Sequence, residues 1–172
     1  MARAEAEQRD TSVGVGAKLA GKYLTFRLGE EEYGLEILKV QEIIQMQAVT
    51  RVPRTPAYVG GVINLRGKVI PVIDLRKKLG LPAVENTDKT CIIVVQIGSD
   101  AGKIVTGIII DEVKEVLDVA AENIEETPDF GSSINTEFIL GIGKIGQNVK
   151  ILLDIDKVMS AGEMSALMSM DF

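Results

Sequence analysis

The residue types that most often carry out catalysis near neutral pH are absent or isolated in this sequence. None of the 172 residues is histidine, which excludes Ser-His-Asp and Cys-His catalysis and histidine metal sites. The single cysteine, Cys91, can form neither an internal disulfide nor a CxxC redox pair, and this fits a reducing compartment. Paired carboxylates such as Asp154 and Asp156 could act as acid and base or hold a hard cation, but no calcium-loop pattern surrounds them. We therefore predict a protein that is not an enzyme and needs no metal and no cofactor.

The segment Gly141–Gly146 (GIGKIG) matches the GxGxxG pattern of dinucleotide-binding folds. That pattern needs a strand before it and a helix N-terminus after it, because the helix end receives the pyrophosphate. Here a strand-like apolar segment, Val149–Leu153, follows instead, and too little chain remains for a βαβ unit. We predict that these glycines serve the backbone geometry of a β-hairpin.

The segment Asn64–Gly67 (NLRG) places an arginine on a turn between two apolar segments. Asn and Gly suit a tight turn, while the planar guanidinium of Arg66 suits bidentate binding of a carboxylate. That carboxylate could belong to this chain, which would make Arg66 a structural brace, or to a partner. The sequence leaves both interpretations open.

Charge and composition exclude two further classes of function. The chain has 19 Lys and Arg against 25 Asp and Glu, a net charge of −6, and only 4% aromatic residues. A nucleic-acid-binding domain needs a basic surface for the phosphates and often aromatic rings for the bases, so we expect no nucleic acid. The longest apolar run, Cys91–Val95, is far shorter than the roughly 20 residues that span a bilayer, so we expect no membrane insertion.

The elements that would position these residues are mainly strands, since Ile and Val dominate the hydrophobic residues and β-branched side chains favour strands. The patterns predict an N-terminal arm without structure over residues 1–21, and then the following elements. Hairpins are expected at 23–37, 58–73, 90–110 and 138–154; helical segments at 38–46, 75–79 and 155–170; and a helix-like stretch with a polar loop at 111–136.

Two motifs recur in the same order along the chain. Residues 34–43 match residues 107–116, and residues 61–75 match residues 141–155, with identical or similar aliphatic residues at the repeated positions. Because five short strands are too few for a flat sheet with protected edges, we expect each repeat to curl into a small barrel. The predicted fold is mainly β with short helices: two five-stranded β-barrel lobes that share a hydrophobic core in one domain, residues 22–170, with the second lobe centred on 90–155 and a C-terminal helix.

Three long segments resemble the CheW family of bacterial chemotaxis coupling proteins. They are LGEEEYGLEILKVQEI (residues 28–43), TPAYVGGVINLRGKVIPVIDLR (residues 55–76) and NTEFILGIGKIG (residues 135–146), and the resemblance extends over residues 22–168. It implies two SH3-like barrels and a non-enzymatic, cytoplasmic adaptor that is monomeric when free. In the family, this adaptor links the hairpin tip of chemoreceptors to the histidine kinase CheA, at receptor clusters on the inner face of the membrane. The alternative is a CheW-like module that serves a different two-component signalling complex.

The resemblance also implies three sets of binding residues. The receptor-binding groove would be formed by Ile37, Val40, Glu42, Arg66 and Cys91. The kinase-binding face would include Val59, Gly60 and Gly61. Phe130 would lie on the face that closes alternating rings of kinase and coupler.

Overall fold

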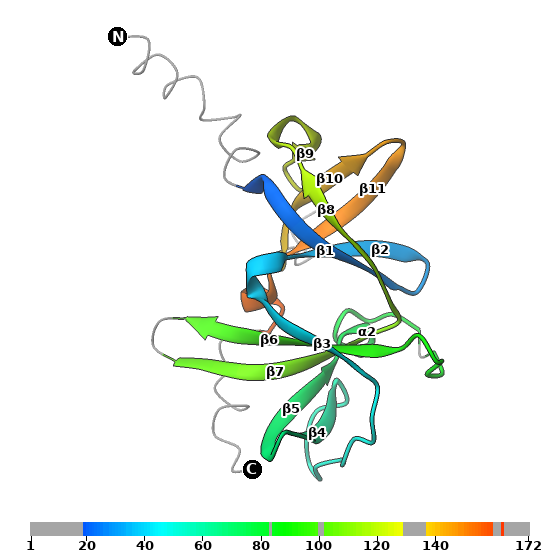
Figure 1. Ribbon diagram of the computed structural model, residues 1–172, viewed down its shortest axis with the longest axis vertical. Helices are drawn as coiled ribbons and strands as arrows, with labels where there is room; N and C mark the ends of the chain where they lie inside the picture. The colour runs from blue at the N-terminus through cyan, green and yellow to red at the C-terminus, as the bar shows by residue number, and fades with distance from the viewer. Residues whose placement is uncertain (1–18, 83, 100–101, 129–136, 160–162, 164–172) are drawn as a thin grey trace.

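The computed structural model describes residues 19–82, 84–99, 102–128, 137–159 and 163, which form two β-sheets (Figure 1). Sheet A has the strand order β8-β1-β2-β11-β10-β9, and sheet B has the order β3-β6-β7-β5-β4. The strands are β1 (Gly21–Leu28), β2 (Glu31–Glu36), β3 (Val40–Gln45), β4 (Val59–Leu65), β5 (Lys68–Asp74), β6 (Cys91–Ser99), β7 (Gly102–Ile110), β8 (Glu112–Val119), β9 (Ile124–Glu125), β10 (Ile139–Ile145) and β11 (Asn148–Leu153). The helical elements are the 3₁₀ turns η1 (Ile37–Lys39), η2 (Ala121–Asn123) and η3 (Ile155–Lys157), and the short helix α2 (Leu75–Lys78).

The first strands in the two orders are β8 in sheet A and β3 in sheet B. The segment that follows each of them pairs with a strand near the other end of the same sheet, and this pairing closes the sheet. In sheet B, Thr50 lies beyond β3 and forms an isolated bridge with Val62 of β4, with N–O distances of 2.9 and 2.8 Å. In sheet A, β9 follows β8 and pairs with β10. Closure of this kind leaves few unpaired strand edges, as we expected for two small barrels.

The two sequence repeats are interleaved between the sheets. Sheet A takes β1 and β2 from the first repeat and β8 to β11 from the second, while sheet B takes β3 to β5 from the first and β6 and β7 from the second. The repeats meet at two antiparallel pairs, β1–β8 and β3–β6, and at two parallel pairs, in which Gly34 lies opposite Leu152 and Gly107 lies opposite Val72. The prediction that each repeat forms its own lobe, with the second centred on 90–155, is therefore wrong. When the two repeats exchange hairpins, strand edges that would stay open in a separate repeat become paired.

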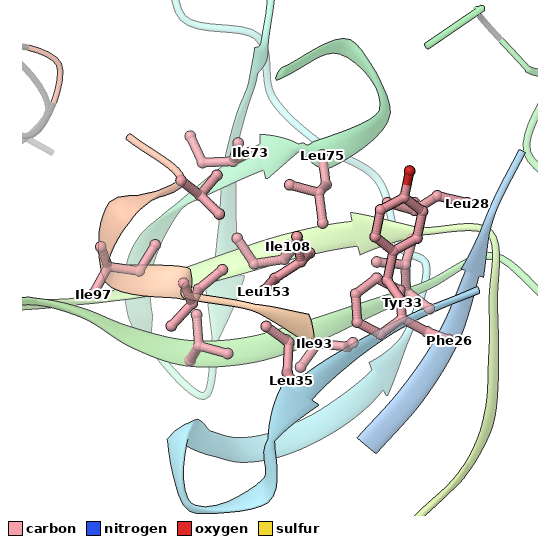
Figure 2. Close-up of a cluster of buried hydrophobic side chains, with 14 of the residues drawn as sticks. Phe26, Leu28, Tyr33, Leu35, Ile73, Leu75, Ile93, Ile97, Ile108 and Leu153 are labelled. Atoms are coloured by element: carbon pink, nitrogen blue, oxygen red, sulfur yellow. The ribbon is translucent and has the colours of Figure 1, made fainter. Parts of the chain in front are cut away.

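Among the described residues, three hydrophobic clusters hold these sheets. The largest lies between the sheets, and Figure 2 shows Phe26 and Leu35 of sheet A meeting Ile93 and Ile108 of sheet B there. We call it the shared core. A second cluster around Val94 fills sheet B, and a third around Tyr23 fills sheet A. The aliphatic core shared by both lobes is thus confirmed.

The expected hairpins are all present, but two segments that we expected to be helical are strands. Residues 38–46 form η1 followed by β3, and residues 112–119 form β8. The register of β3 shifts between Val40 and Glu42, so Val40 packs against the shared core while Ile44 packs against the cluster inside sheet B. A bulge thus breaks the alternation of a strand and leaves apolar residues at helical spacing.

The ends of the chain also differ from expectation. The first strand already includes Gly21, and the Tyr23 hydroxyl donates a hydrogen bond to the Leu19 carbonyl at 2.6 Å, so folded chain extends into the last residues of the predicted arm. The predicted C-terminal helix begins as the 3₁₀ turn η3, and most of its remaining residues lie outside those described. The helix Leu75–Lys78 is present as predicted and begins after Asp74, whose carboxylate accepts from the Arg76 backbone. No helix within the described ranges is long and apolar enough to cross a membrane.

Candidate binding surfaces

Arg66 and Glu42 form a forked ion pair. Nη1 of Arg66 donates to Oε2 of Glu42 at 2.8 Å, and Nη2 donates to Oε1 at 2.6 Å. The turn presents the arginine because Arg66 has a positive φ of 53° and the Gly67 amide donates to Oδ1 of Asn64 at 2.7 Å. The hydrogen bond from Arg66 holds the pKa of the Glu42 carboxyl below its usual value. The carboxylate that the fork suits is therefore in this chain.

The same arginine stays open to solvent, because its side chain is 71% exposed and that of Glu42 is 28% exposed. The pair bridges β3 and the β4–β5 turn, which are at opposite ends of the strand order of sheet B. Arg66 can thus brace the sheet and still present its outer face to a partner.

The other predicted groove residues lie along the edge of the shared core. Ile37, Val40 and Cys91 are partly buried and pack against it. Cys91 begins β6 and pairs with Gln45 of β3 on one side and with Ile110 of β7 on the other. Burial raises the pKa of its thiol, against the opposing effect of a hydrogen bond with the Val113 backbone. Cys91 therefore behaves as a packing residue.

Sequence reasoning missed two exposed apolar side chains beside these positions. Leu38 on η1 is 95% exposed and Ile43 on β3 is 44% exposed. We call Ile37, Leu38, Val40, Glu42 and Ile43 the β3 surface. Val116, the counterpart of Ile43 in the second repeat, is also 49% exposed, but the sequence does not mark either side chain as exposed.

The segment Val59–Gly61 begins β4, away from the β4–β5 turn that carries Arg66. Val59 is 2% exposed and packs in the shared core. We expected its side chain to contact the kinase, but a buried side chain cannot form a surface contact. Gly61 has a φ of +141°, and a Cβ there would lie 2.1 Å from the Thr50 carbonyl oxygen. Gly60 lies at the register shift between them and is partly exposed. A partner would reach this segment through Gly60 and the backbone.

The remaining predictions have simple outcomes. The segment Gly141–Gly146 forms part of β10 and its turn into β11, so the hairpin interpretation is confirmed. Phe130 lies outside the described residues. Within the described part of the chain, no group of three or more acidic or cysteine side chains is placed to hold a metal ion.

Comparisons with known proteins agree with the fold and the motifs. Residues 22–163 match the family model of the CheW-like domain. Chemotaxis protein CheW of Klebsiella aerogenes is 43% identical over 154 residues, which is 87% of this chain and 90% of the relative. Chemotaxis protein CheW of Treponema pallidum is 38% identical, covering 84% of this chain and 85% of the relative.

A solved structure gives the same result. The scaffolding protein TtCheW from Thermoanaerobacter tengcongensis is 35% identical with a TM-score of 0.72, and the match covers 84% of this chain and 96% of that protein. The family model, the relatives and this structure all cover most of the sequence. The chain therefore belongs to the CheW-like domain family.

Proposed function

We propose that this protein is a non-enzymatic chemotaxis scaffold that links chemoreceptors to the histidine kinase CheA. The observation that carries the proposal is the β3 surface, where exposed Leu38 and Ile43 lie on the same short stretch as the Glu42–Arg66 pair. Apolar anchors bordered by charges suit an amphipathic helix, which docks through residues spaced i, i+3 and i+4. The receptor tip, a helical hairpin, is the occupant we propose for the β3 surface together with Cys91.

The kinase would bind at a different place. Gly60 and Gly61 lie at the start of β4, and two exposed arginines of the preceding loop, Arg51 and Arg54, form no ion pair with the described residues. We propose that the regulatory domain of CheA contacts this segment through backbone and arginine side chains. An adaptor of this kind works through binding free energy alone and brings no covalent chemistry.

We also propose that the protein works in the cytoplasm as a free monomer until receptor clusters recruit it to the inner face of the membrane. The names of its relatives support this location, because those relatives are chemotaxis proteins. Two distinct surfaces on one domain let it join two partners without forming a dimer.

The test is an isotope-labelled NMR titration of the full chain, separately with a receptor hairpin-tip fragment and with a CheA regulatory domain. We expect receptor-induced shifts near Val40, Arg66 and Cys91, and kinase-induced shifts near Gly60 and Gly61. No response to either partner at high micromolar concentration would overturn the proposal, even though the fold would stand.

A matched pair of variants sharpens the receptor assignment. Ile43→Asp places a charge on the β3 surface, while Val149→Asp places one on β11, where the wild-type side chain is similarly exposed at 54%. We expect Ile43→Asp to weaken receptor binding at least about tenfold, because a desolvated charge opposes an apolar anchor. Equal effects of the two variants would show that the receptor does not use the β3 surface.

A further inference from the structure

A buried cluster of three charged residues lies where the chain crosses between the sheets. Nε and Nη2 of Arg76 donate to the Asp74 carboxylate at 3.0 and 3.2 Å, and Nη1 donates to Oδ1 of Asp111 at 3.1 Å. Their side chains are only 6%, 10% and 5% exposed. Asp111 is the residue between β7 of sheet B and β8 of sheet A. We call Asp74, Arg76 and Asp111 the crossover cluster.

The cluster is bonded to both sheets. On the side of sheet A, Oδ2 of Asp111 accepts from the Gly29 amide at 2.7 Å, and the Asp111 amide donates to the Arg27 carbonyl at 3.1 Å. On the side of sheet B, Asp74 ends β5 and Arg76 belongs to α2. Any change in how the sheets sit against each other must therefore rearrange the hydrogen bonds of Asp111.

Each end of the cluster also leads to one of the two proposed binding sites. The Asp74 amide donates to the Tyr58 carbonyl at 2.7 Å, and Tyr58 directly precedes Val59 at the proposed kinase site. At the other end, Asp111 directly follows Ile110, which lies opposite Cys91 of the proposed receptor site in the β6–β7 pair. A continuous set of bonded groups thus joins the two sites.

The fold alone does not require such a cluster. The matching crossover of the first repeat, at η1, is held by Lys39 and Asp156 at 2.9 Å, and these side chains are 37% and 29% exposed. A buried ion pair is also weak evidence for stability, because desolvation offsets much of the attraction. Its better-attested use is to fix one arrangement of the parts it joins.

We propose that Arg76 is a positioning residue that holds the two binding sites in one relative arrangement, so that a partner bound at one site changes the affinity of the other. This inference rests on the proposed function. It requires that each partner prefers one arrangement of Asp111 against Gly29 and Arg76, since only differential binding can couple two sites. The coupling is reciprocal by thermodynamic necessity.

The experiment uses isothermal titration calorimetry to measure the ratio of two dissociation constants of the kinase domain, one without receptor and one with it. The dissociation constant of the CheA regulatory domain is measured for the full chain alone and in the presence of saturating receptor-tip fragment. For the wild type we expect the two constants to differ by about fivefold or more. Arg76→Lys keeps the positive charge but loses the forked hydrogen bonds to Asp74 and Asp111. Asp111→Asn leaves one side-chain oxygen to accept hydrogen bonds, where the carboxylate has two. Both variants should bring the ratio of the two dissociation constants close to one.

The control is Lys77→Gln, which removes a charge from the same short helix at an exposed position outside the cluster. It should retain the wild-type ratio. A wild-type ratio of one, or variants that retain the wild-type ratio, would overturn the inference while leaving a two-site adaptor intact. A wild type that binds neither partner would overturn the proposed function, and the inference with it.

A second measurement uses the wild type alone and so does not depend on whether the variants fold. Binding of the kinase domain should shift the NMR amide signals of Gly29, Asp111 and Val113, which lie away from the proposed kinase site. Shifts confined to the neighbourhood of Gly60 would contradict the inference.

Discussion

The Arg66 guanidinium and the Glu42 carboxylate meet through two parallel hydrogen bonds that join β3 to the β4–β5 turn. Arg66→Glu replaces this attraction with repulsion between two carboxylates. Because both side chains reach solvent, they can move apart, and we expect the thermal midpoint to change little. Receptor affinity should fall roughly tenfold, because the charge at the rim of the β3 surface is reversed.

Circular dichroism melting and receptor titration check this expectation. Lys144→Glu is the matched control, since Lys144 forms an exposed ion pair with Glu125 of sheet A at 2.9 Å. It should leave receptor binding unchanged. A collapsed thermal transition for Arg66→Glu would show that the arginine is chiefly a structural brace.

Phe130→Ala should leave receptor binding unchanged and disrupt the higher-order arrays that we expect the protein to form with kinase. The reason is that the family resemblance assigns Phe130 to the ring interface of kinase and coupler and not to the receptor-binding groove. Pelleting of arrays with receptor and CheA, beside a binary receptor titration, gives the two readouts. Equal loss of both would contradict separate faces.

Gly61→Ala should destabilise the protein by about 3 kcal/mol or more. The new Cβ would collide with the Thr50 carbonyl, whose hydrogen bond with the Val62 amide closes sheet B, at a φ that L residues rarely adopt. Gly67→Ala is the control, because its φ is also positive but nothing lies within 4 Å of the added atom, and a cost of about 1 kcal/mol is expected. Urea unfolding measures both, and equal costs would show that the contact with Thr50 relaxes freely.

Tyr23 and Tyr58 should remain neutral well above pH 10 in the folded protein, and Tyr33 should ionise at a higher pH than a free tyrosine. Burial, with a smaller effect of the Glu36 charge, raises the pKa of Tyr23 to about 12, and burial with a hydrogen bond to Glu163 raises that of Tyr58 to about 12. Burial also raises the pKa of Tyr33. Since folding favours the neutral phenols, their contribution to stability is complete below about pH 10 and is lost as the pH rises toward 12.

Tyrosinate absorbance followed across this pH range tests the prediction, with the urea-unfolded chain as reference. At pH 10 the unfolded chain should be about half ionised and the folded chain much less. Identical titration curves would contradict the burial of these rings.

Lys150→Ile should change the free energy of unfolding by only about 1 kcal/mol in either direction. The ammonium of Lys150 is 2.7 Å from the Glu32 carboxylate, and the side chain of Lys150 is 8% exposed while that of Glu32 is 35% exposed. Its counterpart in the first repeat is the buried Ile70, so the fold accepts isoleucine there, and Glu32 can turn to water.

Glu32→Gln should cost more, about 1 to 3 kcal/mol, because it leaves the buried ammonium without its counter-charge. Chemical denaturation compares the two variants. A larger loss for Lys150→Ile than for Glu32→Gln would show that the ion pair itself stabilises sheet A.

Local patterns in the sequence predicted the hairpins and the repeats well. Strand residues, the NLRG turn and the Asp74 cap act over a few neighbouring positions, so their signals are readable in the chain. The bulged strands β3 and β8 were missed for the opposite reason. Each pairs with a strand from the other repeat, and the bulge in their register removes the alternation that identifies a strand.

Long-range relationships were not readable in the same way. Nothing near Arg66 indicates that its partner is Glu42 rather than a carboxylate of another protein, and nothing near Arg76 indicates Asp111. Likewise, the apolar character of Val59 does not distinguish a core residue from a contact. Such pairings depend on which strands become neighbours, and the interleaving of the repeats decides that.

Interleaving also governs the order in which the molecule can be built during synthesis. The hairpin β1–β2 leaves the ribosome first, yet its neighbours β8 and β11 are among the last strands made. Sheet A can therefore be completed only near the end of translation, which is typical of folds with high contact order. Cutting the chain in the loop before β6 would separate β1 and β2 from β8 and β11, and β3 and β5 from β6 and β7, although the two halves mixed together should reassemble. Because each lobe takes strands from both halves of the chain, we expect the two lobes to be gained or lost together.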